Sequence, residues 1–290
     1  MLQKIEFQES LFETNGQTLN YAMSEKGGSP LLCLHGVTRC WQDMQTVMSV
    51  FAPEQQVFGL DFRGHGLSGR GSGHYLTTDY IRDGVSFVRK HFDVPGVIFG
   101  HSLGAMVAAG IAAEVPERVR AVILEDPPFD TLGTGIFQTS FYAYFSRLNE
   151  LLIDAPKSAP AMARRLAEMR FPSPDGKTLV RMGDVRLPEA IRFHAECLLR
   201  LDTAVLAPIL AGRWLEGWAW ERQLARISCP TLLLVGDTAF GGMLPLEVAD
   251  RIERLVSTTM RIDFQGAGHQ LHATQFERVI EGAKAFLATL

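Results

Sequence analysis

The sequence predicts an α/β fold in which a mostly parallel sheet is covered by helices on both faces. Short apolar or β-branched runs alternate with longer segments of helical periodicity, which is typical of strand–helix–strand units. The chain has 290 residues, enough to bury such a sheet in one large domain. One long interval without strand character predicts an insertion into this alternation.

The chain opens with a predicted antiparallel hairpin. Residues 4–13 and 17–24 have strand character and flank Asn15-Gly16, a dipeptide that favours a two-residue hairpin turn. The strands expected after it share short apolar runs, and they are residues 31–34, 56–60, 97–99, 119–124, 231–235 and 260–264. The helices expected between and after them have helical periodicity or are rich in alanine, and they are residues 43–51, 78–91, 103–114 and 276–287.

Residues 129–226 interrupt this alternation. They have helical periodicity and several prolines but no run that predicts a central strand. An interval of about 100 residues is far longer than an ordinary connection between strands. We therefore expect a helical cap at residues 129–226, inserted into a core made of residues 1–128 and 227–290.

Composition and charge exclude several classes of function. A net charge of −4 with scattered arginines, which we interpret as solvated surface, does not indicate a nucleic-acid partner. We expect no secretory signal, no membrane span and a cytoplasmic protein. The sequence does not determine the oligomeric state, and a homodimer is one of the states it allows. The cysteines form no CxxC pair, and we expect reduced thiols without a metal at Cys33, Cys40, Cys197 and Cys229.

The segment from Gly100 to Gly104 has the pattern G-x-S-x-G, directly after one predicted strand and directly before a predicted helix. That context places Ser102 on a sharp, strained turn that lifts its hydroxyl above the sheet edge. The two glycines let strand and helix approach closely. Ser102 is therefore the predicted nucleophile.

A second backbone segment is positioned to assist this serine. His35, Gly36 and Val37 follow the strand at residues 31–34, where a backbone N–H can meet a substrate carbonyl oxygen. We expect the amides of Val37 and Leu103 to form an oxyanion hole. His35 itself is interpreted as a buried hydrogen-bonding residue.

Three motifs in this order resemble successive signatures of the α/β-hydrolase superfamily: residues 32–36, 61–68 and 100–104. The resemblance covers the chain except the cap. It implies an eight-stranded, mostly parallel sheet with the active site at its carboxyl edge, and a reaction that uses no cofactor. In that family the segment 61–68 is mainly structural, so Asp61, Arg63 and His65 are interpreted as structural residues.

The predicted base is His269. A serine hydroxyl needs a base to take its proton, and histidine does this best near neutral pH. His269 follows the last predicted strand in a Gly-x-Gly-His loop, where the resemblance places the catalytic histidine. His272 is the competing candidate.

The acid departs from the usual pattern of this superfamily. The common position, three residues after Gly236, holds Ala239. Asp126 ends the strand at residues 119–124, the position of the acid in haloalkane dehalogenases and some lactone hydrolases of the superfamily. We favour Asp126 over Asp237, with Glu125 third.

Aromatic side chains in the cap suggest an apolar pocket, although such a series also suits a helix core. The residues expected to contact substrate are Phe137, Phe141, Trp214, Trp218 and Met243. A small, largely hydrophobic ester or lactone fits this composition. A carbon–carbon bond hydrolase of ring-cleavage products and a non-catalytic small-molecule receptor on the same fold are the alternatives.

Overall fold

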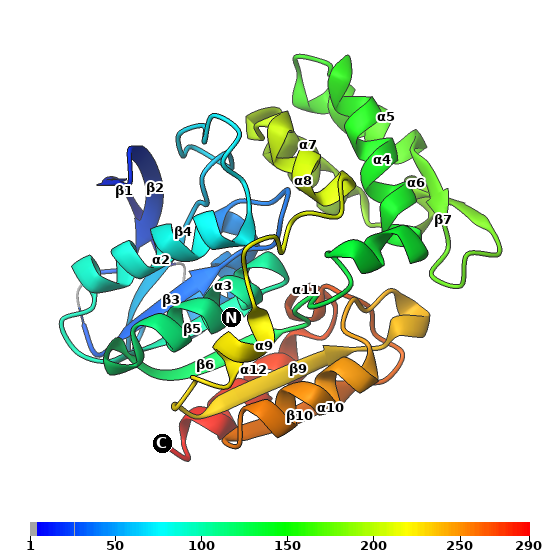
Figure 1. The fold of residues 1–290 in the computed structure, drawn as a ribbon. Coiled ribbons are helices and arrows are strands. Elements are labelled where there is room, and N and C mark those ends of the chain that lie inside the picture. Colours follow the sequence, from blue (N-terminus) through cyan, green and yellow to red (C-terminus); the bar gives the residue numbers. More distant parts are fainter. Residues whose placement is uncertain (1–4, 26) are drawn as a thin grey trace.

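The computed structural model describes residues 5–25 and 27–290, and its central feature is a twisted eight-stranded sheet (Figure 1). The strand order is β1 (Gln8–Thr14), β2 (Gln17–Met23), β4 (Gln56–Leu60), β3 (Pro30–Leu34), β5 (Gly96–His101), β6 (Val119–Glu125), β9 (Thr231–Gly236) and β10 (Thr259–Phe264). β2 is antiparallel to β1 and β4, and the remaining neighbours are parallel. The predicted mostly parallel eight-stranded sheet is confirmed.

Helices cover both faces of this sheet. They are α1 (Gln45–Phe51), α2 (Thr77–His91), α3 (Leu103–Glu114), α10 (Leu246–Leu255), α11 (Leu271–Thr274) and α12 (Phe276–Leu287). Short 3-10 turns are η1 (Trp41–Met44), η2 (Pro116–Arg118), η3 (Thr134–Gln138), η4 (Thr203–Val205) and η5 (Thr238–Phe240). Successive residues of β3 alternate between two cores: Leu32 packs in the cluster with α2, α3 and α10, and Leu31 packs with α1 and α12.

The predicted elements agree closely with the structure. The bounds of β4, α3 and α12 are those expected from the sequence. The helix expected at residues 43–51 divides into η1 and α1, and the first predicted strand begins at Gln8; residue 4 lies outside the described residues. α10 is absent from the predicted set, although it is amphipathic and follows Pro245.

The interval between β6 and β9 holds helices and one small hairpin. These elements are α4 (Ser140–Ile153), α5 (Ala159–Glu168), β7 (Arg170–Pro172), β8 (Leu179–Arg181), α6 (Met182–Val185), α7 (Pro188–Arg200), α8 (Leu206–Leu210) and α9 (Trp220–Leu224). α4 to α8 lie together at one end of the sheet (Figure 1). The cap boundaries 129 and 226 stay a prediction, because α9, inside them, packs against α3 and α10.

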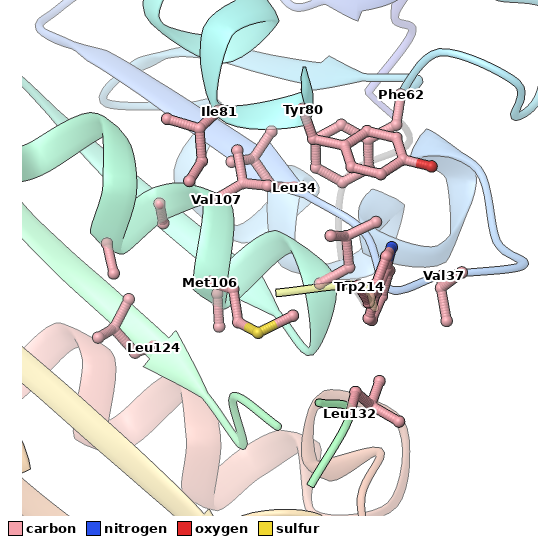
Figure 2. Packing of buried hydrophobic residues seen from close by; sticks show 14 of the residues in the cluster. Leu34, Val37, Phe62, Tyr80, Ile81, Met106, Val107, Leu124, Leu132 and Trp214 are labelled. Carbon is pink, nitrogen blue, oxygen red and sulfur yellow. The ribbon is translucent and has the colours of Figure 1, made fainter. Parts of the chain in front are cut away.

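Trp214 connects the inserted segment to the start of α2. Its side chain is fully buried, and its indole N–H donates to the Tyr75 carbonyl at 3.0 Å. In return, the Thr77 N–H and hydroxyl donate to the Trp214 carbonyl at 3.0 and 2.9 Å. Figure 2 shows Trp214 within the cluster that contains Leu34 and Tyr80. The segment before α9 is therefore anchored in the main core.

Within the described residues, no helix combines the length and the apolar character that a membrane span requires.

Two glycines allow the close contact between β3, β5 and α3. A Cβ at Gly104 would lie 2.1 Å from the Leu34 carbonyl oxygen, and one at Gly100 would lie 2.1 Å from the Gly104 carbonyl oxygen. Both neighbours are backbone atoms, which cannot rotate away as side chains do. The residue type at these positions is therefore set by backbone packing.

We predict that Gly104→Ala lowers the free energy of unfolding by about 2 kcal/mol or more, because overpacking must displace backbone. Urea denaturation measures this change. Gly27→Ala is the control, since a Cβ there meets nothing within 4 Å. Equal stabilities of the two variants would contradict the packing argument.

Candidate active site

The predicted catalytic residues and Val37 follow parallel strands at their carboxyl ends. Val37 follows β3, Ser102 follows β5, Asp126 follows β6 and His269 follows β10. Because these strands run in the same direction, their carboxyl ends meet at one edge of the sheet. The topology thus brings together residues that are far apart in the sequence.

Ser102 lies on the sharp turn that the sequence predicts. Its backbone angles are φ 55° and ψ −117°, a strained conformation for a residue with a side chain. The Ser102 N–H donates to the Glu125 carbonyl at 2.9 Å, which joins the turn to the end of β6. Leu103 then begins α3. The side chain of Ser102 is aimed by backbone that β6 and α3 hold in place.

Asp126 contacts His269 directly. The His269 Nδ1–H donates to Asp126 Oδ2 at 2.6 Å. Asp126 is fully buried and also accepts hydrogen bonds from the N–H groups of Gly236 (3.0 Å) and Met243 (2.7 Å). These bonds fix the carboxylate and select the His269 tautomer that leaves Nε2 free to accept a proton. Asp126 has φ 44°, so its own backbone is strained.

The other two candidate carboxylates bind elsewhere. Asp237 accepts hydrogen bonds from the Ala239 and Gly266 N–H groups, each at 2.9 Å. Glu125 accepts from His272 Nδ1 at 2.8 Å and from the His272 N–H at 2.9 Å. Asp237 therefore organises two loops, and Glu125 pairs with the other histidine.

A cavity of about 480 Å³ opens at this edge, and Ser102 and His269 both line it. Its walls come from the sheet edge, α4, the β7–β8 hairpin, α6 and the loop after β9. They include Val37, Phe141, Tyr144, Phe145, Phe171, Met182, Phe240 and Met243. The cavity is thus lined mainly by apolar and aromatic side chains, as small-molecule sites usually are.

Three of the five residues expected to contact substrate lie outside this cavity. Phe141 and Met243 line it. Phe137 is 52% exposed and stands over Gly212, and Trp214 fills the core as described above. Trp218 packs on Phe129, with ring centroids 5.6 Å apart. Phe137, Trp214 and Trp218 therefore do not line the cavity at Ser102, because helical periodicity predicts a buried face but not the neighbour that covers it.

The loop after β3 is held by buried histidines. The Thr38 N–H donates to His65 Nε2 at 3.2 Å, and the Phe62 N–H donates to His35 Nε2 at 3.2 Å. Burial lowers the pKa of His65 to about 3, so this ring is neutral and can accept. Thr38 has φ 68°, which reverses the chain directly after Val37. His35 and His65 have structural contacts and do not line the cavity.

Asp61 and Arg63 also have structural contacts. Asp61 accepts from the Trp41 N–H at 2.7 Å, and Arg63 makes a paired bond to Asp83, with both distances 2.7 Å. These bonds hold the loop after β4 against α2 and η1. Arg63 is buried, unlike the scattered arginines that are interpreted as solvated surface.

A buried ionic network lies behind the candidate site. Burial alone would lower the pKa of His272, but the charge of Glu125, the hydrogen bond to Glu125 and the nearby carboxylate of Asp43 raise it to about 10. Its Nε2 lies 3.6 Å from Asp43 Oδ2. His272 is therefore an imidazolium between two carboxylates.

His101 connects this network to the candidate base. Its Nε2–H donates to the His269 carbonyl at 3.0 Å, and the two ring centroids are 4.6 Å apart. Burial, followed by the charges of His269 and His272, lowers the pKa of His101 well below its usual value. His101 therefore supports the loop that carries His269.

One group in this network has the side-chain types of a metal site. One potential ligand atom each from Asp43, His101 and His272 lies within 4.8 Å of the others. A protonated His272 has no lone pair to give a metal, and its charge already balances the carboxylates. We assign the group to internal ion pairing.

Two charged residues that line the cavity, Arg39 and Arg186, are absent from the site residues predicted from the sequence. The scattered arginines are interpreted there as solvated surface. The side chain of Arg39 is only 14% exposed. Its position two residues after Val37 was the available signal, whereas nothing in the sequence links Arg186 to this cavity.

We predict that His272→Gln destabilises the fold by about 3–5 kcal/mol at pH 6, because two buried carboxylates lose their cation. The pKa of His272 is raised on folding, so its contribution is complete below about pH 6.5 and is lost as pH rises through about 10. Urea unfolding at pH 6 and at pH 9.5 tests this. The difference from wild type should shrink at the higher pH, whereas exposed His74→Gln should have little effect at either pH. A constant difference would exclude the ion-pair account.

Comparison with known proteins places this geometry in a family. The model of the alpha/beta hydrolase fold matches residues 29–275. The chain is 34% identical over 110 residues to 2-(acetamidomethylene)succinate hydrolase of Mesorhizobium japonicum, a match that spans 38% of this chain and 39% of that protein. It is 24% identical to pimeloyl-[acyl-carrier protein] methyl ester esterase of Photobacterium profundum, over 91% of this chain and 96% of that protein.

A solved structure is similar over almost the whole chain. The enol-lactonase from Burkholderia xenovorans superposes with a TM-score of 0.73 at 13% identity, covering 96% of this chain and 100% of that one. Because the family model spans most of the sequence, this chain belongs to the α/β-hydrolase fold family.

Proposed function

We propose that the protein is a serine hydrolase that cleaves a carboxylic ester or lactone through an acyl-enzyme. Ser102 is the nucleophile, His269 the base and Asp126 the residue that orients the base. The observation that carries this proposal is the 2.6 Å bond between His269 and Asp126 beside a cavity that Ser102 also lines. The relatives named above include an esterase and an enol-lactonase, which agrees with this class of substrate.

The proposed reaction begins when His269 Nε2 takes the proton of the Ser102 hydroxyl as its oxygen attacks the substrate carbonyl carbon. The carbonyl π electrons move to oxygen, and the imidazolium formed is stabilised by Asp126. The electron pair on the oxyanion then re-forms the carbonyl, the bond from carbon to the leaving oxygen breaks, and His269 gives its proton to that oxygen. The alcohol of an ester departs, whereas the hydroxyl formed from a lactone stays attached through the opened acyl chain. Water, activated by His269 in the same way, releases the acid and restores Ser102.

The backbone supports an oxyanion hole at Val37 and Leu103. Within the described residues, neither amide N–H has a hydrogen-bond acceptor. Leu103 stands at the first position of α3, where an N–H has no partner within the helix. A preorganised donor of this kind is typically worth about 3 kcal/mol in the barrier.

The contacts of the carboxylates favour Asp126 as the acid. Asp126 reaches His269 Nδ1, while both oxygens of Asp237 are bonded to backbone N–H groups of neighbouring loops. The size and mainly apolar lining of the cavity favour a small substrate with a largely hydrophobic body.

Covalent labelling tests the nucleophile. We predict that a fluorophosphonate probe labels the wild type and that Ser102→Ala abolishes labelling. Ser140→Ala is the matched control, because Ser140 lines the same cavity and should leave labelling intact. An unlabelled wild type would count against a serine hydrolase and favour a receptor.

A second experiment tests the acid. Asp126→Asn should reduce kcat on p-nitrophenyl esters or lactones by about 10³–10⁴-fold, because His269 loses the acceptor that fixes its tautomer. Asp237→Asn should cost far less, since its bonds are to loop amides. Steady-state kinetics on both variants, with circular dichroism to confirm folding, measures the difference. The reverse order would assign the acid to Asp237.

A further inference from the structure

The cavity at Ser102 carries positive charge that no cavity-lining carboxylate balances among the described residues. Arg39 and Arg186 line it, and apart from His269 its other walls are apolar, aromatic or uncharged. Two guanidinium groups that line the same cavity repel each other electrostatically and attract anions. A purely hydrophobic substrate would offer these two guanidinium groups no anionic partner.

Arg39 stands close to the candidate reaction centre. Its backbone is fixed by a turn in which the Arg39 N–H donates to the Gly36 carbonyl at 3.3 Å. It comes two residues after Val37, so the two Cα atoms are at most about 7.6 Å apart. A group bound by Arg39 would therefore lie near the carbonyl that meets the Val37 amide.

Arg39 keeps donors available for a ligand. Its nearest carboxylate is Asp43, at 3.9 Å from Nε, and Asp43 also pairs with His272. Within the described residues, the terminal nitrogens of Arg39 have no hydrogen-bond acceptor. Such a guanidinium can bind a carboxylate through two parallel N–H bonds.

Arg186 brings a second positive charge to the cavity. It directly follows α6, and its Nη1 donates to Gln270 Oε1 at 2.5 Å. Gln270 is neutral and is the residue after His269, so this bond places Arg186 beside the catalytic loop without neutralising its charge. The two arginines thus come from the core and from the inserted segment.

We propose that Arg39 and Arg186 form a carboxylate-binding subsite, and that the substrate is a small ester or lactone bearing a carboxylate a few bonds from the scissile carbonyl. This assignment rests on the serine-hydrolase function proposed above and narrows its substrate. The apolar walls then hold the hydrocarbon part, and the arginines fix the anionic end. The carboxylate orients the scissile carbonyl toward Ser102.

Two esters that differ in one group test the subsite. Monomethyl glutarate carries a carboxylate where methyl valerate carries a methyl group, and pH-stat assays give kcat/KM for each. The wild type should prefer the glutarate ester. The preference ratio should fall about tenfold or more in Arg39→Gln and in Arg186→Gln, since each removes charge-assisted bonds, and it should recover in part in the lysine variants. Arg226→Gln is the matched control: Arg226 also donates to a glutamine oxygen, that of Gln223, but lies outside the cavity, so the ratio should stay unchanged.

The outcomes separate this inference from the proposed function. Hydrolysis of both esters with a ratio that neither arginine variant changes overturns the subsite and leaves the hydrolase intact. If neither ester is cleaved, titration calorimetry with glutarate decides. Binding that is lost in Arg39→Gln and Arg186→Gln supports the subsite without hydrolysis, and no binding overturns it. Arg186 is exposed, so its variant keeps the test valid even if Arg39→Gln fails to fold.

Discussion

One buried carboxylate holds the candidate active-site edge of the sheet together. Asp126 directly follows β6, and its two oxygens accept hydrogen bonds from the N–H groups of Gly236 and Met243 and from the ring of His269. These partners belong to the end of β9, to the loop beyond it and to the loop after β10. Because an ionised carboxylate without partners is costly to bury, each of the three bonds is needed to keep it there. The position of the histidine is thus tied to the packing of three neighbouring strands.

Glu125, the residue before Asp126, also binds a histidine. Glu125 and Asp126 are consecutive, so their side chains leave the strand end in different directions. Glu125 binds His272, whose positive charge also faces Asp43, and Asp126 binds His269. His101 lies between the two histidines and contacts both rings. The loop that carries His269 is therefore supported, through His101, by the buried ionic groups of His272, Glu125 and Asp43.

The sequence predicted most of the sheet and the sharp turn that carries Ser102, because both depend on local patterns. Strand runs and the glycines around Ser102 follow from periodicity and backbone sterics, which act over a few residues. The acid was harder, since Asp126 and Asp237 both follow strand ends and only the fold determines which one reaches His269. Preferring Asp126 from sequence agrees with the contacts in the structure, and its catalytic role stays a prediction.

Residues of the inserted segment were the least predictable. Trp214 and Trp218 are aromatic and periodic, as pocket residues are, yet they fill the core and its margin. Arg186 has no local signal, because its cavity is formed by segments far apart in the chain. Periodicity shows that a face is buried, but the identity of the neighbour depends on tertiary packing.

The position of Asp126 has a consequence for the loop after β9. Ala239 and Phe240 line the cavity on that loop, while the carboxylate that orients the histidine belongs to another strand. The side chains that shape this part of the cavity and the carboxylate that binds His269 thus lie in separate stretches of the sequence. Ala239 and Phe240 face the cavity with side chains that take no part in the hydrogen bonds of Asp126 and His269. Substitutions there would change the shape of the cavity and leave the chemical groups of the candidate site the same.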